Sequence, residues 1–212
     1  MNDSQFQWYM VVNTLVAVGT LGTVVVALFG NYWRRRFFPP KLKVQLCEPA
    51  GELTSSRFAE QSKKSWYYHV MVENEHRWSP ATNVSLHLVA MDLPGPDNQF
   101  IREWNGDVQL KWAFMAFYPA QNRTVGKPIR YDLVSVDEEF SNLALHPIAA
   151  STSLKATRQG KCRFAVWLQA RSSESDSRIA RIEISWDGVW KDNPADMDKH
   201  LILKRTQEIS KG

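Results

Sequence analysis

An uncharged apolar run near the N-terminus limits the possible folds more than any other feature. Residues 8–29 read WYMVVNTLVAVGTLGTVVVALF, a run of 22 residues without a formal charge. At about 1.5 Å of rise per residue, a helix of this length measures about 33 Å and can cross the hydrocarbon core of a bilayer. The sequence therefore predicts a single transmembrane helix, to which the more polar remainder of the chain is attached.

Both ends of the run carry residue types that favour the membrane interface, namely Trp8, Tyr9, Tyr32, Trp33, Arg34, Arg35 and Arg36. A cleaved signal peptide is the alternative, but it requires basic residues before a shorter apolar core, and MNDSQFQ contains none. We therefore expect a retained single-pass anchor in the plasma (inner) membrane. Because Lys and Arg concentrate on the cytoplasmic side, residues 1–7 would lie outside and the C-terminal domain would be cytoplasmic.

One face of the predicted span is rich in small and polar residues. At 100° per residue, seven small or polar residues fall within roughly 160° of one helical face: Asn13, Ala17, Gly19, Thr20, Thr23, Ala27 and Gly30. Gly19, Thr23 and Ala27 recur every four residues, a spacing that allows two helices to approach closely, and Asn13 gains from an interhelical hydrogen bond. Single-pass helices also carry such residues without a partner. The pattern makes this face a candidate for self-association.

Beyond the span, apolar and polar residues alternate with a period of two, which is typical of half-buried strands. The alternation predicts strands at 42–46, 66–73, 84–90, 108–115, 162–171 and 181–186, with weaker candidates at 129–136 and 200–204. Residues 137–157 are irregular in pattern and are expected to form a loop or a short helix. Turn residues at Pro80, Pro94-Gly95, Asn105-Gly106-Asp107 and Asp187-Gly188 separate several of these runs. The expected fold is mainly β: one transmembrane helix (8–33), a basic and proline-containing linker (34–40), one antiparallel β-sandwich (41–205) and a flexible tail (206–212).

The same alternation predicts which side chains point inward. Trp66, Trp112 and Trp186 fit inward positions, whereas Trp78, Trp104, Trp167 and Trp190 fit loops or outward positions. Cys47 is expected outward and Cys162 inward, which argues against a disulfide between them. Two cysteines in 212 residues also fit a reducing compartment.

A resemblance supports this fold. The passage YYHVMVEN, a short proline-containing loop and then ATNVSLHLVAM resembles two consecutive strands of prokaryotic immunoglobulin-like modules. The later LKWAF, IRYDLVSV and RIEISWDGVW are similar to further strands of membrane-anchored bacterial proteins of this build. The resemblance covers about residues 41–205. It implies an immunoglobulin-like β-sandwich behind an anchor, and it implies no reaction and no catalytic residue.

Metal-site candidates are few in this sequence. If the strands that carry His69 and His87 form a hairpin, the two imidazoles lie opposite each other, although a metal requires more ligands. The acidic segment WKDNPADMDKH lacks the ligand order of a calcium loop. Asp192 or Asn193 is expected instead to cap a short turn that begins at Pro194.

The familiar catalytic motifs are missing from the sequence. It has no phosphate-binding loop, HExxH or GxSxG motif, and Thr152 stands where an SxxK nucleophile requires Ser. The sequence therefore predicts no cofactor, no metal and no catalytic residue. The sequence leaves open a second alternative, an enzyme whose catalytic residues are dispersed over several strands.

The expected function is that of a non-enzymatic module that binds a protein or ligand at the membrane. Outward aromatic and imidazole side chains form its expected partner surface, namely Tyr67, His69, His87, Trp167 and Trp190. The expected partners are the lipid bilayer and either a second copy or a protein of the same operon. Nucleic acid is not expected, because three of the charges behind the net +4 belong to residues 34–36. The alternative is a membrane-perturbing effector of bacterial defence with a β-rich sensor domain.

Overall fold

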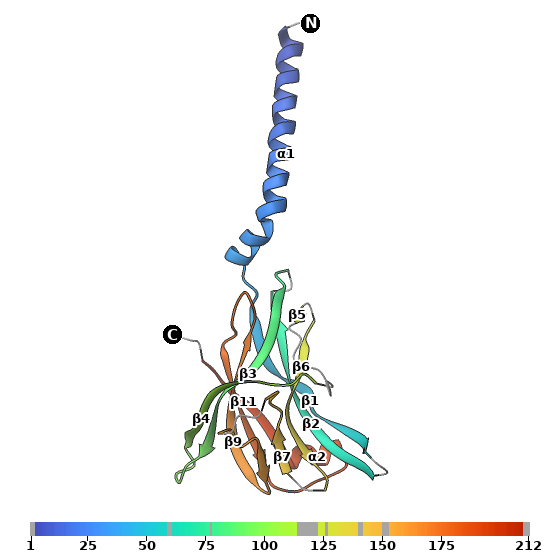
Figure 1. Cartoon of the computed structure of the whole chain (residues 1–212), viewed down its shortest axis with the longest axis vertical. Helices are drawn as coiled ribbons and strands as arrows, with labels where there is room; N and C mark the ends of the chain where they lie inside the picture. The colour runs from blue at the N-terminus through green and yellow to red at the C-terminus, as the bar shows by residue number, and fades with distance from the viewer. Residues whose placement is uncertain are drawn as a thin grey trace. The chain divides into compact units, whose positions relative to one another are not determined.

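The computed structural model describes residues 3–58, 61–76, 78–113, 123–125, 127–139, 142–149 and 153–209. The chain divides into two compact units, residues 1–39 and residues 40–212. The first is the N-terminal helix, and the second is called the β-sheet unit below (Figure 1). The expected strand residues Phe114 and Met115, together with Thr152, lie outside the described residues.

The N-terminal helix α1 (Asp3–Phe37) is longer than the predicted span at both ends. Residues 34–37, which the sequence assigned to a linker, continue the helix, and the chain leaves helical geometry immediately before Pro39. Within α1, Gln7–Gly30 is long and apolar enough by length and composition to cross a membrane, and none of it is buried inside the protein. The prediction of an N-terminal apolar helix is confirmed.

The β-sheet unit is built from two antiparallel sheets in the described part of the chain. The five-stranded sheet has the order β1 (Leu42–Phe58), β2 (Gln61–Asn74), β6 (Ile129–Asp137), β7 (Asn142–Leu145) and β8 (Thr157–Gln159). The six-stranded sheet has the order β11 (Leu201–Ile209), β10 (Ile179–Trp186), β9 (Cys162–Arg171), β3 (Ala81–Pro94) and β4 (Phe100–Gln109), with β5 (Arg123–Val125) paired to β3. In Figure 1, β1 and β2 stand out as a long hairpin.

Both sheets contribute to one hydrophobic core. Trp66 and Tyr68 of the five-stranded sheet and Phe164 and Trp186 of the six-stranded sheet are almost fully buried in it. Residues 110–113 connect the sheets, because Leu110 donates its backbone N–H to Leu86 of β3 and Lys111 accepts from Asp132 of β6. The predicted inward positions of Trp66, Trp112 and Trp186 are confirmed.

Two expectations about side-chain placement are wrong, and the condition for placing His69 opposite His87 is not met. The strands that carry His69 and His87 do not form a hairpin, because β2 belongs to the five-stranded sheet and β3 to the six-stranded one. Trp104 is 6% exposed and part of the core rather than outward. Cys47, expected outward, is buried, because β1 shifts register between Leu46 and Gly51 and regular alternation fails there. Both cysteines are free thiols.

The turn expected at residues 105–107 is also wrong, since these residues lie inside β4. The β3–β4 turn is instead at Pro94-Gly95, as predicted for that site, and Asn98 completes it in the left-handed region at φ 58°. Residues 137–157, expected to be irregular, contain β7.

A short helix, α2 (Pro194–His200), precedes β11. Asn193 caps it, because its side-chain oxygen accepts a hydrogen bond from the backbone N–H of Ala195, and Pro194 occupies the first turn. This confirms the predicted capping role for the segment. Met197 is the residue through which α2 joins the core.

Candidate functional site

The five residues predicted to form a partner surface lie in three separate places. Tyr67 and His69 are on the side of the five-stranded sheet opposite the buried Trp66 and Tyr68. His69 is only 3% exposed, however, so it is not available as the surface residue that the alternation predicted. His87 and Trp167 are on the outer face of the six-stranded sheet. Trp190 follows β10, and its ring centre lies 6.5 Å from that of the buried Trp66.

Arginine and aromatic side chains form a continuous stack on the outer face of the six-stranded sheet. Its members, in spatial order, are Arg163, Phe100, Arg181, Trp167 and Arg102. The guanidinium carbons of Arg163 and Arg181 lie 4.9 and 4.5 Å from the centre of the Phe100 ring. Those of Arg181 and Arg102 lie 5.7 and 5.1 Å from the Trp167 ring. The negative face of an aromatic ring attracts a cation at such distances. We call these five residues the arginine–aromatic face.

Strand periodicity and register bring these side chains together. Arg163 and Trp167 are four residues apart on β9 and therefore share one side of the sheet. Trp167 pairs directly with Arg181 of β10, so their side chains are cross-strand neighbours. Sequence reasoning identified Trp167 alone, because its partners come from three strands and share no linear motif.

A buried carboxylate holds the stack in place. The side chain of Asp92 is 7% exposed, and its Oδ1 lies 2.5 Å from Nε of Arg102. Its Oδ2 accepts a hydrogen bond of 2.6 Å from the indole N–H of Trp167 and lies 3.8 Å from Nε of Arg181. A buried charge persists only where partners compensate for its lost hydration, and Asp92 has three. The arginine–aromatic face is thus a rigid surface rather than a set of independent side chains.

A second carboxylate fixes the opposite end of the stack. Glu183 lies 2.5 Å from Arg181 and 3.3 Å from Arg163. Burial alone would raise the pKa of the Glu183 carboxyl, but the hydrogen bonds from Arg181 and Arg163 outweigh it and hold that pKa below its ordinary value. The side chains of Arg102 and Arg163 stay 42% and 45% exposed. They can offer N–H donors to an incoming carboxylate.

A chain of hydrogen bonds on the same face has the order of a catalytic triad. Nε2 of His87 lies 2.9 Å from the Ser85 hydroxyl, and its Nδ1 lies 2.6 Å from a carboxylate oxygen of Asp107. Only the pairing of β3 with β4 reveals it, since Asp107 comes 20 residues after His87. Ser85 is 9% exposed, which leaves little access for a substrate, and Arg171 neutralises Asp107 at 2.5 Å. These hydrogen bonds and the ion pair therefore join β3, β4 and β9.

The outer face of the five-stranded sheet carries a different polar cluster. Nδ1 of His69 lies 3.0 Å from Asp132, and the Tyr67 ring stacks on both His69 and His146, with ring centres 6.4 and 5.4 Å apart. Nε2 of His146 lies 2.8 Å from the Ser135 hydroxyl. Burial lowers the pKa of His146, which favours the neutral ring. Sequence reasoning missed His146, because it lies just beyond β7 in the stretch read as irregular.

The candidate metal ligands are not brought together within the described residues. The described residues contain no group of three or more His, Cys, Asp or Glu side chains that could hold a metal ion. In the acidic segment, Asp192 pairs with Lys64 at 2.9 Å and Asp196 with Lys199 at 2.8 Å. These carboxylates are thus used in exposed ion pairs.

The candidate association residues Asn13, Gly19, Thr23 and Ala27 are all exposed on α1. The Thr23 hydroxyl donates a 2.9 Å hydrogen bond to the backbone oxygen of Gly19 in its own helix. The Asn13 amide makes no hydrogen bond within the described part of the chain. Of these residues, Asn13 has the hydrogen-bonding groups to offer a second helix.

The residues predicted for the membrane interface lie near the two ends of α1. Trp8, Tyr9, Tyr32 and Trp33 are between 44% and 71% exposed. Arg36 is exposed as well, whereas the side chains of Arg34 and Arg35 lie outside the described residues.

No protein-family model matches the chain, and no curated protein matches its sequence.

Proposed function

We propose that this protein is a membrane-anchored, immunoglobulin-like β-sandwich that binds an acidic partner through the arginine–aromatic face. The span holds the β-sheet unit at the cytoplasmic side of the inner membrane. The partner is a protein that presents carboxylates, either encoded in the same operon or a second copy of this chain. The module uses no cofactor, metal or nucleic acid and catalyses no reaction.

The observation that carries the proposal is the preorganised stack around Asp92. Arg, Trp and Phe are enriched at the centres of protein interfaces, and rigid side chains lose little entropy on binding. Asp92 and Glu183 fix the guanidinium groups before any partner arrives. Such a surface favours bidentate contact with carboxylates. The low exposure of Ser85 supports a binding role over an enzymatic one.

A pair of matched charge reversals tests this proposal. Arg163→Glu reverses a 45% exposed charge on the arginine–aromatic face, and Arg130→Glu reverses a 53% exposed charge on the five-stranded sheet. The full chain, with a photoreactive residue in place of the exposed Lys204 on β11, would be cross-linked in its native membrane. We expect one adduct of defined mass, reduced about tenfold or more by Arg163→Glu and unchanged by Arg130→Glu.

Two controls make the outcome decisive. Thermal unfolding should show that both variants remain folded at the temperature of the cross-linking experiment, so that lost cross-linking reports binding. The adduct should also weaken as salt is raised, because the proposed contact joins opposite charges. Equal cross-linking by the two variants would refute the arginine–aromatic face as the binding surface.

A further inference from the structure

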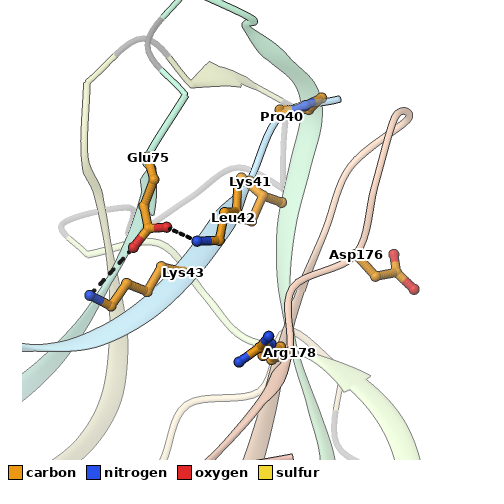
Figure 2. Close-up of a pocket in the computed structure, with 7 residues that line it drawn as sticks. All are labelled: Pro40, Lys41, Leu42, Lys43, Glu75, Asp176 and Arg178. Atoms are coloured by element: carbon orange, nitrogen blue, oxygen red, sulfur yellow. Dashed lines mark ion pairs between the residues drawn. The ribbon is translucent and has the colours of Figure 1, made fainter. Parts of the chain in front are cut away.

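A cavity of about 350 Å³ opens where β1 begins. Figure 2 shows the residues that line it: Pro40, Lys41, Leu42, Lys43, Glu75, Asp176 and Arg178. They come from the first residues of the β-sheet unit, the end of β2 and the segment before β10. Its volume falls within the range of small-ligand sites.

Hydrogen bonds to the sheet framework preform the cavity. The hydroxyl of Ser175 donates a 2.7 Å hydrogen bond to the backbone oxygen of Pro40, and the N–H of Lys41 donates to the side-chain oxygen of Asn74 at 3.1 Å. The N–H of Glu75 donates to the Lys41 oxygen at 2.9 Å. These bonds join three separate segments, so the walls are in place before a ligand enters.

The charges that line the cavity favour an anion. Glu75 lies 2.6 Å from Lys41 and 3.5 Å from Lys43, and the hydrogen bond with Lys41 holds the pKa of the Glu75 carboxyl below its ordinary value. One carboxylate thus faces two ammonium groups. Arg178 is exposed and makes no ion pair within the described residues. In Figure 2 its guanidinium points toward β1, whereas the Asp176 carboxylate points away.

The chain connection determines which anions are within reach. Only Phe38 and Pro39 separate the last helical residue from Pro40. Consecutive Cα atoms are 3.8 Å apart, so Pro40 lies within about 11 Å of the end of α1, whatever direction the chain takes. With Gln7–Gly30 in a bilayer, the seven helical residues that follow add about 10 Å, so Pro40 lies within about 21 Å of the end of the span and the cavity can reach the phosphate layer.

We propose that this cavity binds the phosphate group of an anionic phospholipid. Arg178 and Lys43 would donate to the phosphate oxygens, while Glu75 orients Lys41 beside them. The inference rests on the proposed membrane anchor but not on the proposed acidic partner. A phosphate ester bound here would add a specific contact to the nonspecific attraction between basic residues and the membrane surface.

The test uses the purified full chain in detergent, with phosphatidylglycerol or phosphatidylcholine added and bound lipid counted by native mass spectrometry. The double variant Lys43→Gln/Arg178→Gln removes two cations from the cavity. The matched control, Lys111→Gln/Arg130→Gln, removes two exposed cations elsewhere on the β-sheet unit. We expect wild type and control to bind phosphatidylglycerol about tenfold more tightly than phosphatidylcholine, and the cavity variant to lose this preference.

Three outcomes would overturn the inference. They are equal binding of both lipids by wild type, loss of the preference in the control, and displacement of phosphatidylglycerol by an equal concentration of inorganic phosphate. The last would assign the cavity to free phosphate. Extraction of the membranes with alkaline carbonate checks the anchor separately: a protein that leaves the membrane refutes the anchor, whereas a retained protein without lipid preference refutes the cavity alone.

Discussion

The carboxylate of Asp92 accepts a hydrogen bond from the indole N–H of Trp167, with 2.6 Å between the oxygen and the nitrogen. Asp92 is on β3 and Trp167 on β9, and both lie on the outer face of the six-stranded sheet. This bond joins the aromatic part of the stack to its buried charge. It makes Trp167 a donor as well as a stacking surface.

Trp167→Phe keeps an aromatic ring at this position and removes the donor. Hydrogen bonds to a charged group contribute about 1.5–3 kcal/mol, so we expect the free energy of unfolding to fall by about that amount. Urea titration of the full chain in detergent, followed by tryptophan fluorescence, measures it. Trp78→Phe is the control, since Trp78 is 52% exposed and should change stability little. Equal effects of both substitutions would contradict a special role for the Asp92 contact.

Gly51→Ala should destabilise the β1–β2 hairpin. A Cβ at residue 51 would lie 2.9 Å from Cζ of Tyr68, whose ring is fully buried and cannot move aside. Overpacking of this kind costs about 1–3 kcal/mol. Gly160→Asn is the matched control: nothing lies within 4 Å of that Cβ, and Asn tolerates the φ of +62°. Thermal unfolding of both variants compares them directly.

The stability of the β-sheet unit should fall as the solution becomes acidic, in part through His146. Burial lowers the folded-state pKa of this ring, although the charges of Asp132 and Asp137 oppose the shift. The unfolded chain therefore binds the proton more readily, and stability is lost as the pH falls from about 6.5 toward the lower folded pKa. His146→Gln should flatten this part of the curve of unfolding free energy against pH. A variant that keeps the whole wild-type slope would assign the titration to another group.

Self-association of α1 should depend on Asn13 and Gly19. Asn13→Leu removes the amide, and Gly19→Leu blocks close approach, so each should weaken a membrane two-hybrid signal severalfold. Thr23→Val should leave the signal intact, because the Thr23 hydroxyl already bonds to Gly19 within its own helix. Val18→Leu, about 180° from the middle of that face, is the control for a change on the opposite side. Wild-type signals from Asn13→Leu and Gly19→Leu would remove the proposed association face.

Membrane orientation can be measured with introduced cysteines. The native thiols are poor reporters, because burial raises the pKa of both Cys47 and Cys162. In a background without them, Gln7→Cys should react with an impermeant maleimide on intact cells. Gln159→Cys, exposed on β8, should react only after the membrane is opened. The reverse pattern would place the β-sheet unit outside.

Much of the fold follows from alternation, and its failures have physical causes. Trp66, Trp112 and Trp186 are buried as predicted, because every second residue of a regular strand faces the core. Trp104 is different: a Cβ on Gly106 would collide with its indole ring. The absence of that side chain lets the ring lie across the strand. Asn105-Gly106 therefore has the residue types of a turn, but Gly106 lies inside β4 and leaves room for the Trp104 ring.

Alternation assigns side chains to faces but does not specify which strands become neighbours. For this reason the sequence left open a hairpin that would bring His69 and His87 opposite each other, whereas β2 pairs with β6 and β3 with β9. The arginine–aromatic face depends on the same long-range pairing, since its residues come from β4, β9 and β10. Only the three-dimensional arrangement could reveal it.

The way β1 begins has a mechanical consequence. β1 pairs antiparallel with β2 from Leu42 to Phe58, and the chain enters it directly from α1. A pull applied through the helix along the strand axis would load these hydrogen bonds in shear, so that many of them share the force. The hydrogen bonds of Pro40 and Lys41 would be the first to bear this force. A β-sheet unit connected in this way would resist a pull on α1 through many hydrogen bonds at once, rather than through one pair at a time.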